Sequence, residues 1–588
     1  MSRDYCFVHM RLRLVGQQVL VIALLTILGV FLVWPIVLTV KGGFAGADGA
    51  FSLAPIKLVF ADPSLRASLL TSGLIASVTT MLCVLISLPL AVVSARYGFL
   101  GKGFWNALVL VPLVLPPFVG AIGMKHLLGR AGAMNALLGT EFDVLGAGRF
   151  WGVIIVEALH LYPIVYLNAL SSLANLDPTL EEAGRNLGAG GWMRFRRITL
   201  PLIRPGIFAG ATIVFIWSFT ELGTPLMFDM RHVLPVQVFY QLKEMESSAQ
   251  PYALTVVMLV AAMLLYLVGK VLFGSRGYAM YSKASIHAQT RPLGGVGTAA
   301  AWLLFALVII PAMLPHLGVI AASFSRPGQW YHSVLPTAWT TNHFVDALGH
   351  SLAIGSIANS LKYAVISMSL TVVIGTLIGY LVVRGRVLGR GLLDTMSMLP
   401  LAVPGVVLAF GYVAITLAPP FTWRGELTGW RAWFAPLARH FDVLGPQADP
   451  LVLLVIAYAV RRLPYMVRSV TAGLEQTAVE LEEAARNLGA GPIRSFSKIT
   501  LPLITANLIA GGLLVFSFSM LEVSDSLILA QREVHFPMTK AIYTLYQRLG
   551  DGEYIASAMG VWGMLLLIIT LTGASVLMGR KAGALFRV

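Results

Sequence analysis

The sequence predicts an all-α membrane protein that crosses the bilayer about twelve times, built as two six-helix repeats in the same orientation. Two observations support this fold class. Hydrophobic residues make up 57% of the 588 residues and charged residues only 12%, which is about half the charged fraction of a soluble domain. The two halves of the chain also repeat one another, segment by segment. The composition excludes an ordinary soluble enzyme and a disordered chain.

Runs of apolar residues give the expected spans, because a membrane-crossing helix needs about 20 such residues. Those of the first half lie near residues 19–40, 67–94, 105–124, 150–174, 205–223 and 252–273. Those of the second half lie near residues 299–323, 359–383, 392–417, 451–474, 506–528 and 555–578. The first run is too long for the apolar core of a secretion signal, so we expect it to anchor the chain.

The distribution of basic residues predicts the orientation. The formal net charge is +15, and Lys and Arg gather on the cytoplasmic loops of membrane proteins. With the N-terminus in the cytoplasm, the basic excess falls on cytoplasmic segments and the outer loops stay near neutral. We therefore expect a multi-pass membrane protein with both termini in the cytoplasm, and no nucleic-acid partner. Cys6 and Cys83 provide neither a disulfide framework nor a metal cluster, so no metal site is expected.

An internal duplication divides the chain. The segment LEEAGRNLGAG at 180–190 returns as LEEAARNLGAG at 481–491, and neighbouring prolines and glutamates recur in register. Each repeat holds an even number of spans, so an axis along the membrane normal should relate them. The basic segment 275–298 contains Ser, Gly and Pro and is the expected linker. We therefore predict two halves of six spans each, residues 1–285 and 286–588.

Each half carries one long cytoplasmic loop, near 177–204 and near 477–505, with the same sequence pattern. Asp177 followed by proline is typical of a helix start. Thr477 with Glu480 predicts a capping box in the second copy. Gly188 and Gly489 suit a helix end in the left-handed conformation. An exposed, capped, amphipathic helix between two spans is a docking element, and nothing in it calls for catalysis.

These two loops resemble the EAA loops of ABC importer permeases. Glu182-Ala-Gly, then Gly188 and Ile198-x-Leu-Pro, is similar to that motif, and the copy that begins at Glu483 matches it fully. The whole chain resembles a fused, double-length permease of the class that serves ferric iron, thiamine, polyamines or aminoethylphosphonate. The resemblance implies the type I ABC importer permease fold, a bacterial inner membrane, two copies of a cytoplasmic ATPase and an extracytoplasmic solute-binding protein.

The resemblance also assigns roles to residues. Glu182 and Glu483 become the carboxylates that dock the ATPase, and the small residues beside them allow close approach. The full docking set is Glu182, Ala183, Gly184, Gly188, Glu483, Ala484, Ala485 and Gly489. The chain contains no G-x-x-x-x-G-K-[ST] segment, so ATP and its magnesium should bind the partner ATPase, and this chain should hold no cofactor and no catalytic residue.

Ionisable residues inside spans are costly and therefore mark functional sites by default. Glu221 and Glu522 are repeat-equivalent, and so are His160 and Arg461. We predict that these four residues line the solute pathway, with His160 and Arg461 suited to an anion. Three alternatives remain open: internal pairing, for example of Glu157 with Arg461; snorkelling of these side chains toward a headgroup layer; and capping of a helix break by the two glutamates.

Pro163 and Pro464 are expected to break the fourth span of each half above the docking loop, which makes them candidate hinges. The paired prolines Pro112 and Pro116, and Pro400 and Pro404, predict kinks in the third span of each half. Such kinks occur where helices pack or where they line a cavity.

The cargo is the least determined feature, because the binding protein sets most of the selectivity in this class. Ferric iron is the first expectation. A phosphonate or another small organic anion comes next, then thiamine or a polyamine, which as cations would fit poorly beside an unpaired Arg461. A secondary transporter driven by an ion gradient is the main rival, but it would not need twin docking loops. A membrane enzyme is a weaker rival, since the 11 histidines are scattered.

Overall fold

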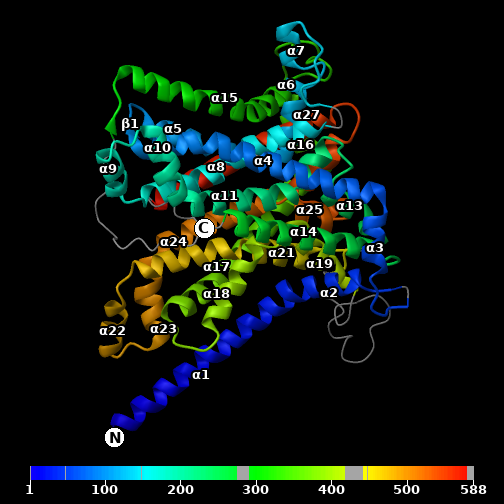
Figure 1. The fold of residues 1–588 in the computed structure, drawn as a ribbon. Coiled ribbons are helices and arrows are strands. Elements are labelled where there is room, and N and C mark those ends of the chain that lie inside the picture. Colours follow the sequence, from blue (N-terminus) through cyan, green and yellow to red (C-terminus); the bar gives the residue numbers. More distant parts are fainter. Residues whose placement is uncertain are drawn as a thin grey trace.

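The computed structural model describes residues 2–46, 48–114, 116–146, 149–273, 291–417, 441–445 and 448–578. The chain is almost entirely helical (Figure 1). The helices of the first half are α1 (Ser2–Leu28), α2 (Trp34–Gly43), α3 (Ala54–Ala61), α4 (Pro63–Arg96), α5 (Lys102–Leu108), α6 (Pro117–Leu128), α7 (Ala133–Leu138), α8 (Phe150–Ala174), α9 (Pro178–Asn186), α10 (Gly191–Arg194), α11 (Leu200–Phe219), α12 (Gly223–Met227), α13 (Leu234–Tyr240) and α14 (Gln250–Phe273).

The helices of the second half follow the same order. They are α15 (Gly295–Phe324), α16 (Asn342–Gly349), α17 (Ser351–Arg384), α18 (Arg390–Met398), α19 (Gly405–Leu417), α21 (Leu451–Glu475), α22 (Val479–Asn487), α23 (Pro492–Ser495), α24 (Leu501–Met520), α25 (Ser524–Leu529), α26 (Met538–Tyr546) and α27 (Gly552–Met578). Single turns of 3₁₀ or π geometry are η1 (Gly29–Val33), η2 (Val111–Val114), η4 (Phe195–Thr199), η5 (Gln241–Glu244), η6 (Leu399–Leu401), η9 (Phe496–Thr500) and η10 (Glu533–His535). Strands β1 (Tyr97–Gly98) and β2 (Arg291–Pro292) form one short parallel pair.

The predicted all-α membrane fold is confirmed. Within the described residues, nine helices are long and apolar enough to cross a membrane, and two bent pairs raise the number to eleven. The remaining expected span is α21. It is 25 residues long, like its counterpart α8, but it carries three arginines. Because those arginines lower its hydropathy, α21 is the span that composition alone supports least, although its position in the repeat matches that of α8.

The third span of each half is broken rather than straight. The segment formed by α5 and η2 meets α6 at 97°, and the segment formed by α18 and η6 meets α19 at 105°. Pro116 lies directly before α6, and Pro404 lies directly before α19. A proline cannot donate a backbone hydrogen bond and disfavours a helical residue before it. The prolines therefore produce breaks where the sequence predicted kinks.

The first span of each half packs on the other half. Helix α15 lies against α6, α4 and α5, while α1 and α2 lie against α17, α18 and α19 (Figure 1). Close backbone approach makes this possible. A Cβ atom on Gly123 of α6 would lie 2.5 Å from the carbonyl oxygen of Pro315, and one on the equivalent Gly411 of α19 would lie 2.9 Å from that of Pro35. Small residues at such crossings bring membrane helices together.

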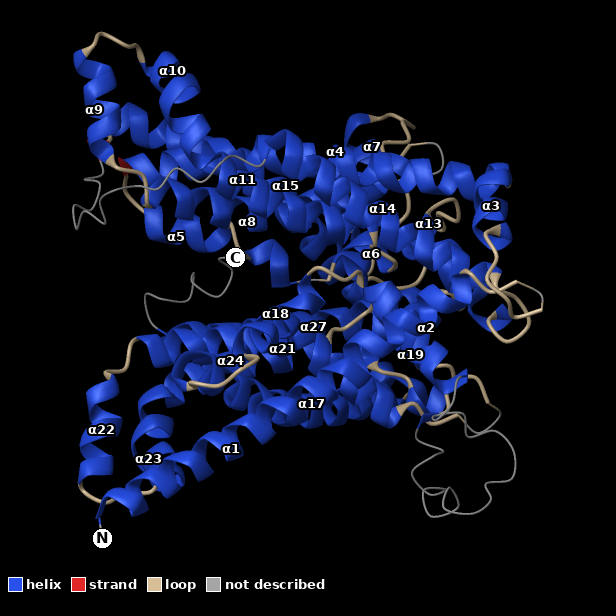
Figure 2. Cartoon of the chain, turned by 60° about the horizontal axis from the view of Figure 1, so that its bottom comes forward, coloured by secondary structure: helices blue, strands red, loops and turns tan. Residues whose placement is uncertain are grey.

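The second and fifth spans of each half pack on its fourth span. Helix α8 packs on α4 and α11, and α21 packs equivalently on α17 and α24. Loop helices α9 and α22 lie at the same end of the molecule, on opposite sides of it, and the N-terminus lies at that end too (Figure 2). The predicted division at residue 285 falls outside the described residues, so the structure does not test it.

Candidate functional site: a central cavity and two loop helices

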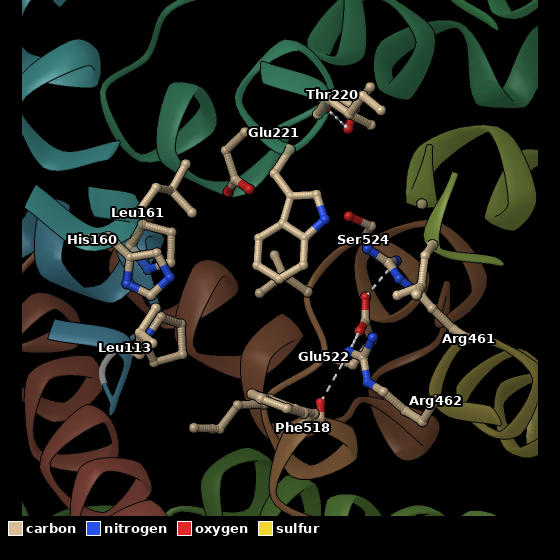
Figure 3. A pocket seen from close by; sticks show the side chains of 18 of the residues that line it. Leu113, His160, Leu161, Thr220, Glu221, Arg461, Arg462, Phe518, Glu522 and Ser524 are labelled. Atoms are coloured by element: carbon tan, nitrogen blue, oxygen red, sulfur yellow. Dashed lines mark hydrogen bonds and ion pairs between the residues drawn. The ribbon is translucent and has the colours of Figure 1, made fainter. Parts of the chain in front are cut away.

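One cavity of about 200 Å³ lies between the two halves and is lined by both (Figure 3). All four residues predicted to face the pathway border it: His160, Glu221, Arg461 and Glu522. His160 lies beside Leu113 and Leu161 on one side, and Arg461 and Arg462 lie on the other (Figure 3). The structure thus brings the four residues together, and their contact with solute stays a prediction.

Helix breaks place two of these side chains, those of Glu221 and Glu522, in the cavity wall. Helix α11 ends at Phe219 and α24 ends at Met520, so the two glutamates that follow lie in short connections to α12 and α25. The expected fifth span of each half therefore ends earlier than predicted, and it also begins earlier, at Leu200 and Leu501. Pro116 and Pro404, at the breaks of the third spans, also line the cavity. Irregular backbone at membrane depth is tolerated where it lines such a space.

The second-half wall holds a buried ion-pair network. Arg461 Nη1 donates to Glu522 Oε1 at 2.8 Å and lies 3.5 Å from Asp525 Oδ2. Arg462 pairs with Glu522 and donates to the carbonyl oxygen of Phe518 at 3.2 Å. The suggested pairing of Glu157 with Arg461 is therefore wrong, and so is the premise that Arg461 is unpaired. The alternative of internal pairing is correct for Arg461, with Glu522 as the partner.

Gly405 makes room for this network. A Cβ atom at that position would lie 2.1 Å from Nη1 of Arg461, so the guanidinium group rests directly against the backbone where α19 begins. The first half has Pro117 at the corresponding place. In the sequence this glycine is visible only as part of a Pro-Gly pair. The space that it leaves is used by Arg461, a side chain 56 residues further along the chain.

Among the described residues, the first-half wall has no comparable ion-pair network. Glu221 Oε1 accepts hydrogen bonds from the backbone N–H groups of Gly223 and Thr224, at 3.1 and 3.2 Å. The alternative that this glutamate caps a helix break is thus correct. Glu157 is 1% exposed and accepts a hydrogen bond from Ser218, but its Oε1 finds no partner among the described residues. His160 Nδ1 lies 2.8 Å from the carbonyl oxygen of Pro112.

The expected helix breaks at Pro163 and Pro464 are absent. Helices α8 and α21 run without interruption through them. A proline inside a membrane helix is tolerated when the surrounding helices hold the segment in place, and polar side chains of neighbouring helices bond the backbone close to both prolines. Near Pro163, Ser87 of α4 donates to the carbonyl oxygen of Tyr162 at 2.7 Å. Near Pro464, Thr371 of α17 donates to that of Ala459 at 3.4 Å. The break is wrong, and the hinge role stays a prediction.

Loop helix α9 starts as predicted and α22 does not. Asp177 accepts a hydrogen bond from the backbone N–H of Thr179 at 2.9 Å, and Pro178 is the first helical residue. These hydrogen bonds hold the pKa of Asp177 below its usual value of 3.8. The predicted capping box at Thr477 is wrong: α22 starts after Ala478 without a side-chain cap, because the Thr477 hydroxyl donates to the carbonyl oxygen of Leu474 instead.

The predicted docking residues divide between the two faces of each loop helix. The exposed members are Glu182, Ala183, Glu483 and Ala484, and the buried members are Gly184 and Ala485. A Cβ atom on Gly184 would lie 2.6 Å from Cδ1 of Ile198, so glycine at this position lets the Ile198 side chain lie close to the loop helix. Gly188 and Gly489 end the helices with φ of +77° and +85°, the left-handed conformation that their sequence positions predicted.

Sequence reasoning missed the carboxylates that hold the loop helices in place. Glu181 pairs with Arg96, and Glu482 pairs with Arg384 at 3.2 Å. Each arginine is the last residue of the second span of its half. The repeat itself was the available signal, since both pairs recur in register. Metal ligands are a separate matter: within the described ranges, no group of three or more His, Cys, Asp or Glu residues is arranged to hold a metal ion.

Comparison with known proteins decides the family. A family model described as "Binding-protein-dependent transport system inner membrane component" matches residues 87–276 and, a second time, residues 371–582. The chain belongs to this family. The two matches coincide with the two halves, so the permease is a fused double-length member, as the loop motifs indicated. Members of this family are transport components, and the permease is not an enzyme.

Individual relatives agree with this assignment. A ferric transport system permease protein of Actinobacillus pleuropneumoniae is 27% identical over 85% of this chain and 69% of its own length. A putative ferric transport system permease protein of Haemophilus influenzae is 25% identical over 82% of this chain and 71% of its own length. The molybdenum transport system permease protein of Escherichia coli K12 is 33% identical, over 29% of this chain and 74% of its own length.

Proposed function

We propose that this permease forms the solute pathway of a binding-protein-dependent ABC importer and takes up ferric iron. The observation that carries the proposal is the cavity of about 200 Å³ between the two halves, with two loop helices at one end of the molecule that expose Glu182 and Glu483. Two ATPase copies would dock on these helices, and their ATP-driven closure would rock the halves about the cavity. A solute-binding protein would deliver cargo at the opposite end.

The charges of the cavity wall support a cationic cargo. Arg461 and Arg462 are offset by Glu522 and Asp525. Glu157 and Glu221 form no ion pair in the part of the chain that the structure describes. Carboxylate oxygens suit hard cations. A transport pathway must also release the ion that enters it. Two carboxylates therefore serve passage of a cation better than a complete set of metal ligands would.

Other cargoes remain alternatives. A phosphonate or another small anion gains support from the similarity to molybdenum permeases over part of the chain, but the paired state of both arginines weakens the case. Thiamine and polyamines would fit poorly beside an unpaired Arg461, and this argument against them no longer applies because Arg461 is paired with Glu522. Relatives that are ferric transport permeases over most of this chain give iron the broader support.

The proposed setting is the bacterial inner membrane, with both termini in the cytoplasm. The N-terminus lies at the end that carries α9 and α22 (Figure 2), which is the cytoplasmic end if the ATPases dock there. The basic excess of the inner loops agrees with this orientation. The C-terminal residues 579–588 lie outside the described residues.

Reconstitution into liposomes tests the proposal. The chain alone should not move ⁵⁵Fe(III), whereas the chain with its ATPase, binding protein and ATP should accumulate it. Parallel arms with radiolabelled aminoethylphosphonate, thiamine and spermidine test the alternatives. Iron uptake by the chain alone, driven by an ion gradient, would establish a secondary transporter instead.

A charge reversal tests the docking assignment. Glu182→Lys combined with Glu483→Lys should release the ATPase from the membrane and abolish uptake, because the two introduced lysines would repel a basic partner surface. Glu141→Lys, an exposed residue outside the loop helices, is the matched control. Retained ATPase binding with coupled uptake in the double variant would overturn the docking assignment.

A further inference from the structure

We infer that Arg96 and Arg384 are positioning residues that transmit the movement of each loop helix to the membrane. The inference rests on the proposed function, since it assumes that the ATPase acts through α9 and α22. The two arginines lie outside both loop motifs, so the inference adds residues to the mechanical link between the ATPase and the membrane helices. Each arginine terminates the second span of its half and reaches the first turn of the loop helix.

The first-half contact joins three elements. Arg96, at the end of α4, pairs with Glu181 of α9 and donates to the hydroxyl of Thr199 at 2.6 Å. Thr199 in turn donates to Glu181 Oε1 at 2.7 Å, and it is the last residue of η4, where α11 begins. The loop helix is thus bonded to the inner ends of the second and fifth spans together.

The second-half contact is more buried and joins a different third element. Arg384 and Glu482 are 11% and 5% exposed at their side chains, against 27% and 26% for Arg96 and Glu181. Arg384 also donates to the backbone carbonyl oxygens of Leu474, at 2.9 Å, and Thr477, at 2.7 Å. These carbonyls lie at and just beyond the end of α21, so α22 is bonded to the second and fourth spans.

The arrangement explains how a surface helix can move a bundle. The carboxylates on the outer face, Glu182 and Glu483, remain exposed for the ATPase, while their sequence neighbours on the inner face hold the membrane helices. Because α4 packs on α8 and α11, and α17 packs on α21 and α24, a pull on either loop helix reaches the helices that line the cavity. A charge-assisted hydrogen bond transmits such a pull with fixed geometry.

Substitution of both arginines tests this role in the full complex. In liposomes that contain the chain, its ATPase and its binding protein, Arg96→Met with Arg384→Met should leave the ATPase bound. Solute-stimulated ATP hydrolysis and ⁵⁵Fe(III) uptake should fall roughly tenfold, the middle of the range for a coupling between two sites. Arg386→Met, an exposed arginine two residues from Arg384, is the control and should change neither readout.

Charge exchange separates transmission from mere folding. Arg96→Glu combined with Glu181→Arg rebuilds the pair in reverse and should restore part of the coupled hydrolysis that either single variant loses. Normal coupling in the double methionine variant would overturn the inference, and so would loss of ATPase binding in that variant. The proposed function fails separately, since it predicts release of the ATPase only when the exposed Glu182 and Glu483 are reversed.

Discussion

Arg461 and Arg462 of the second half occupy the positions of His160 and Leu161 in the first, and Asp525 occupies that of Thr224. The helices around these positions are equivalent, and the side chains are not. Both walls keep buried polar atoms without a partner among the described residues, Glu157 Oε1 in the first half and Arg462 Nε and Asp525 Oδ1 in the second, but the second-half wall alone joins its charged side chains in ion pairs. The comparison teaches that the two repeats share one helix plan while the charges of their two walls are arranged differently.

The largest expected effect comes from breaking the second-half network. Arg462→Met leaves the buried Glu522 short of one partner, and removal of one member of a buried pair costs about 3–5 kcal/mol. The free energy of unfolding in detergent, from thermal and denaturant melts, should fall by this amount. Leu161→Met at the equivalent position should cost less than about 1.5 kcal/mol, because it conserves volume. Equal losses for both variants would contradict the division between the walls.

The paired glutamates sharpen the comparison. Glu522→Gln removes the charge that offsets two arginines and should destabilise by about 3 kcal/mol. Glu221→Gln keeps an oxygen that can accept from the backbone N–H groups of α12, so it should cost at most about 1 kcal/mol, as a weakened cap. For ⁵⁵Fe(III) uptake the order should reverse. Relative to the stability that each variant loses, Glu221→Gln should reduce uptake more than Glu522→Gln does. Thermal melts and ⁵⁵Fe(III) uptake measured on the same preparations provide the check.

The loop helices should differ by a smaller amount. Ala485→Gly in α22 should cost about 1 kcal/mol, the usual helix penalty of glycine. Gly184→Ala in α9 should gain almost nothing alone, because the new Cβ atom would meet the end of Ile198 at 2.6 Å. Combined with Ile198→Val, which shortens that side chain, Gly184→Ala should recover about 0.5–1 kcal/mol. A gain from Gly184→Ala alone would show that Ile198 does not limit the site.

The smallest effect concerns pH at the start of α9. The pKa of Asp177 is lower in the folded chain than its usual 3.8, because the Thr179 N–H and hydroxyl bond the carboxylate. The cap therefore contributes fully above about pH 3.8, and its contribution is lost as the pH falls through the lowered pKa. Amide exchange at Thr179 should accelerate in that window relative to the first turn of α22, which has no side-chain cap. Equal acceleration in both helices would contradict this assignment.

The sequence by itself determined the membrane class, the duplication and the two loop helices, because each depends on local pattern. Apolar runs mark spans, and an eleven-residue repeat marks the loop helices without any long-range contact. The glycines at 188 and 489 were predictable for the same reason, since a left-handed helix end is decided by the residue that occupies it.

Only the tertiary structure decided which charges pair. The identity of the partner of Arg461, the close approach to Gly405, and the bonds from Arg96 and Arg384 to the loop helices all join residues far apart in the chain. The continuity of α8 through Pro163 was also decided there, since α4 and α11 pack along this helix. In a membrane interior, polar groups must find partners within the protein, and a linear pattern does not say which helix will supply them.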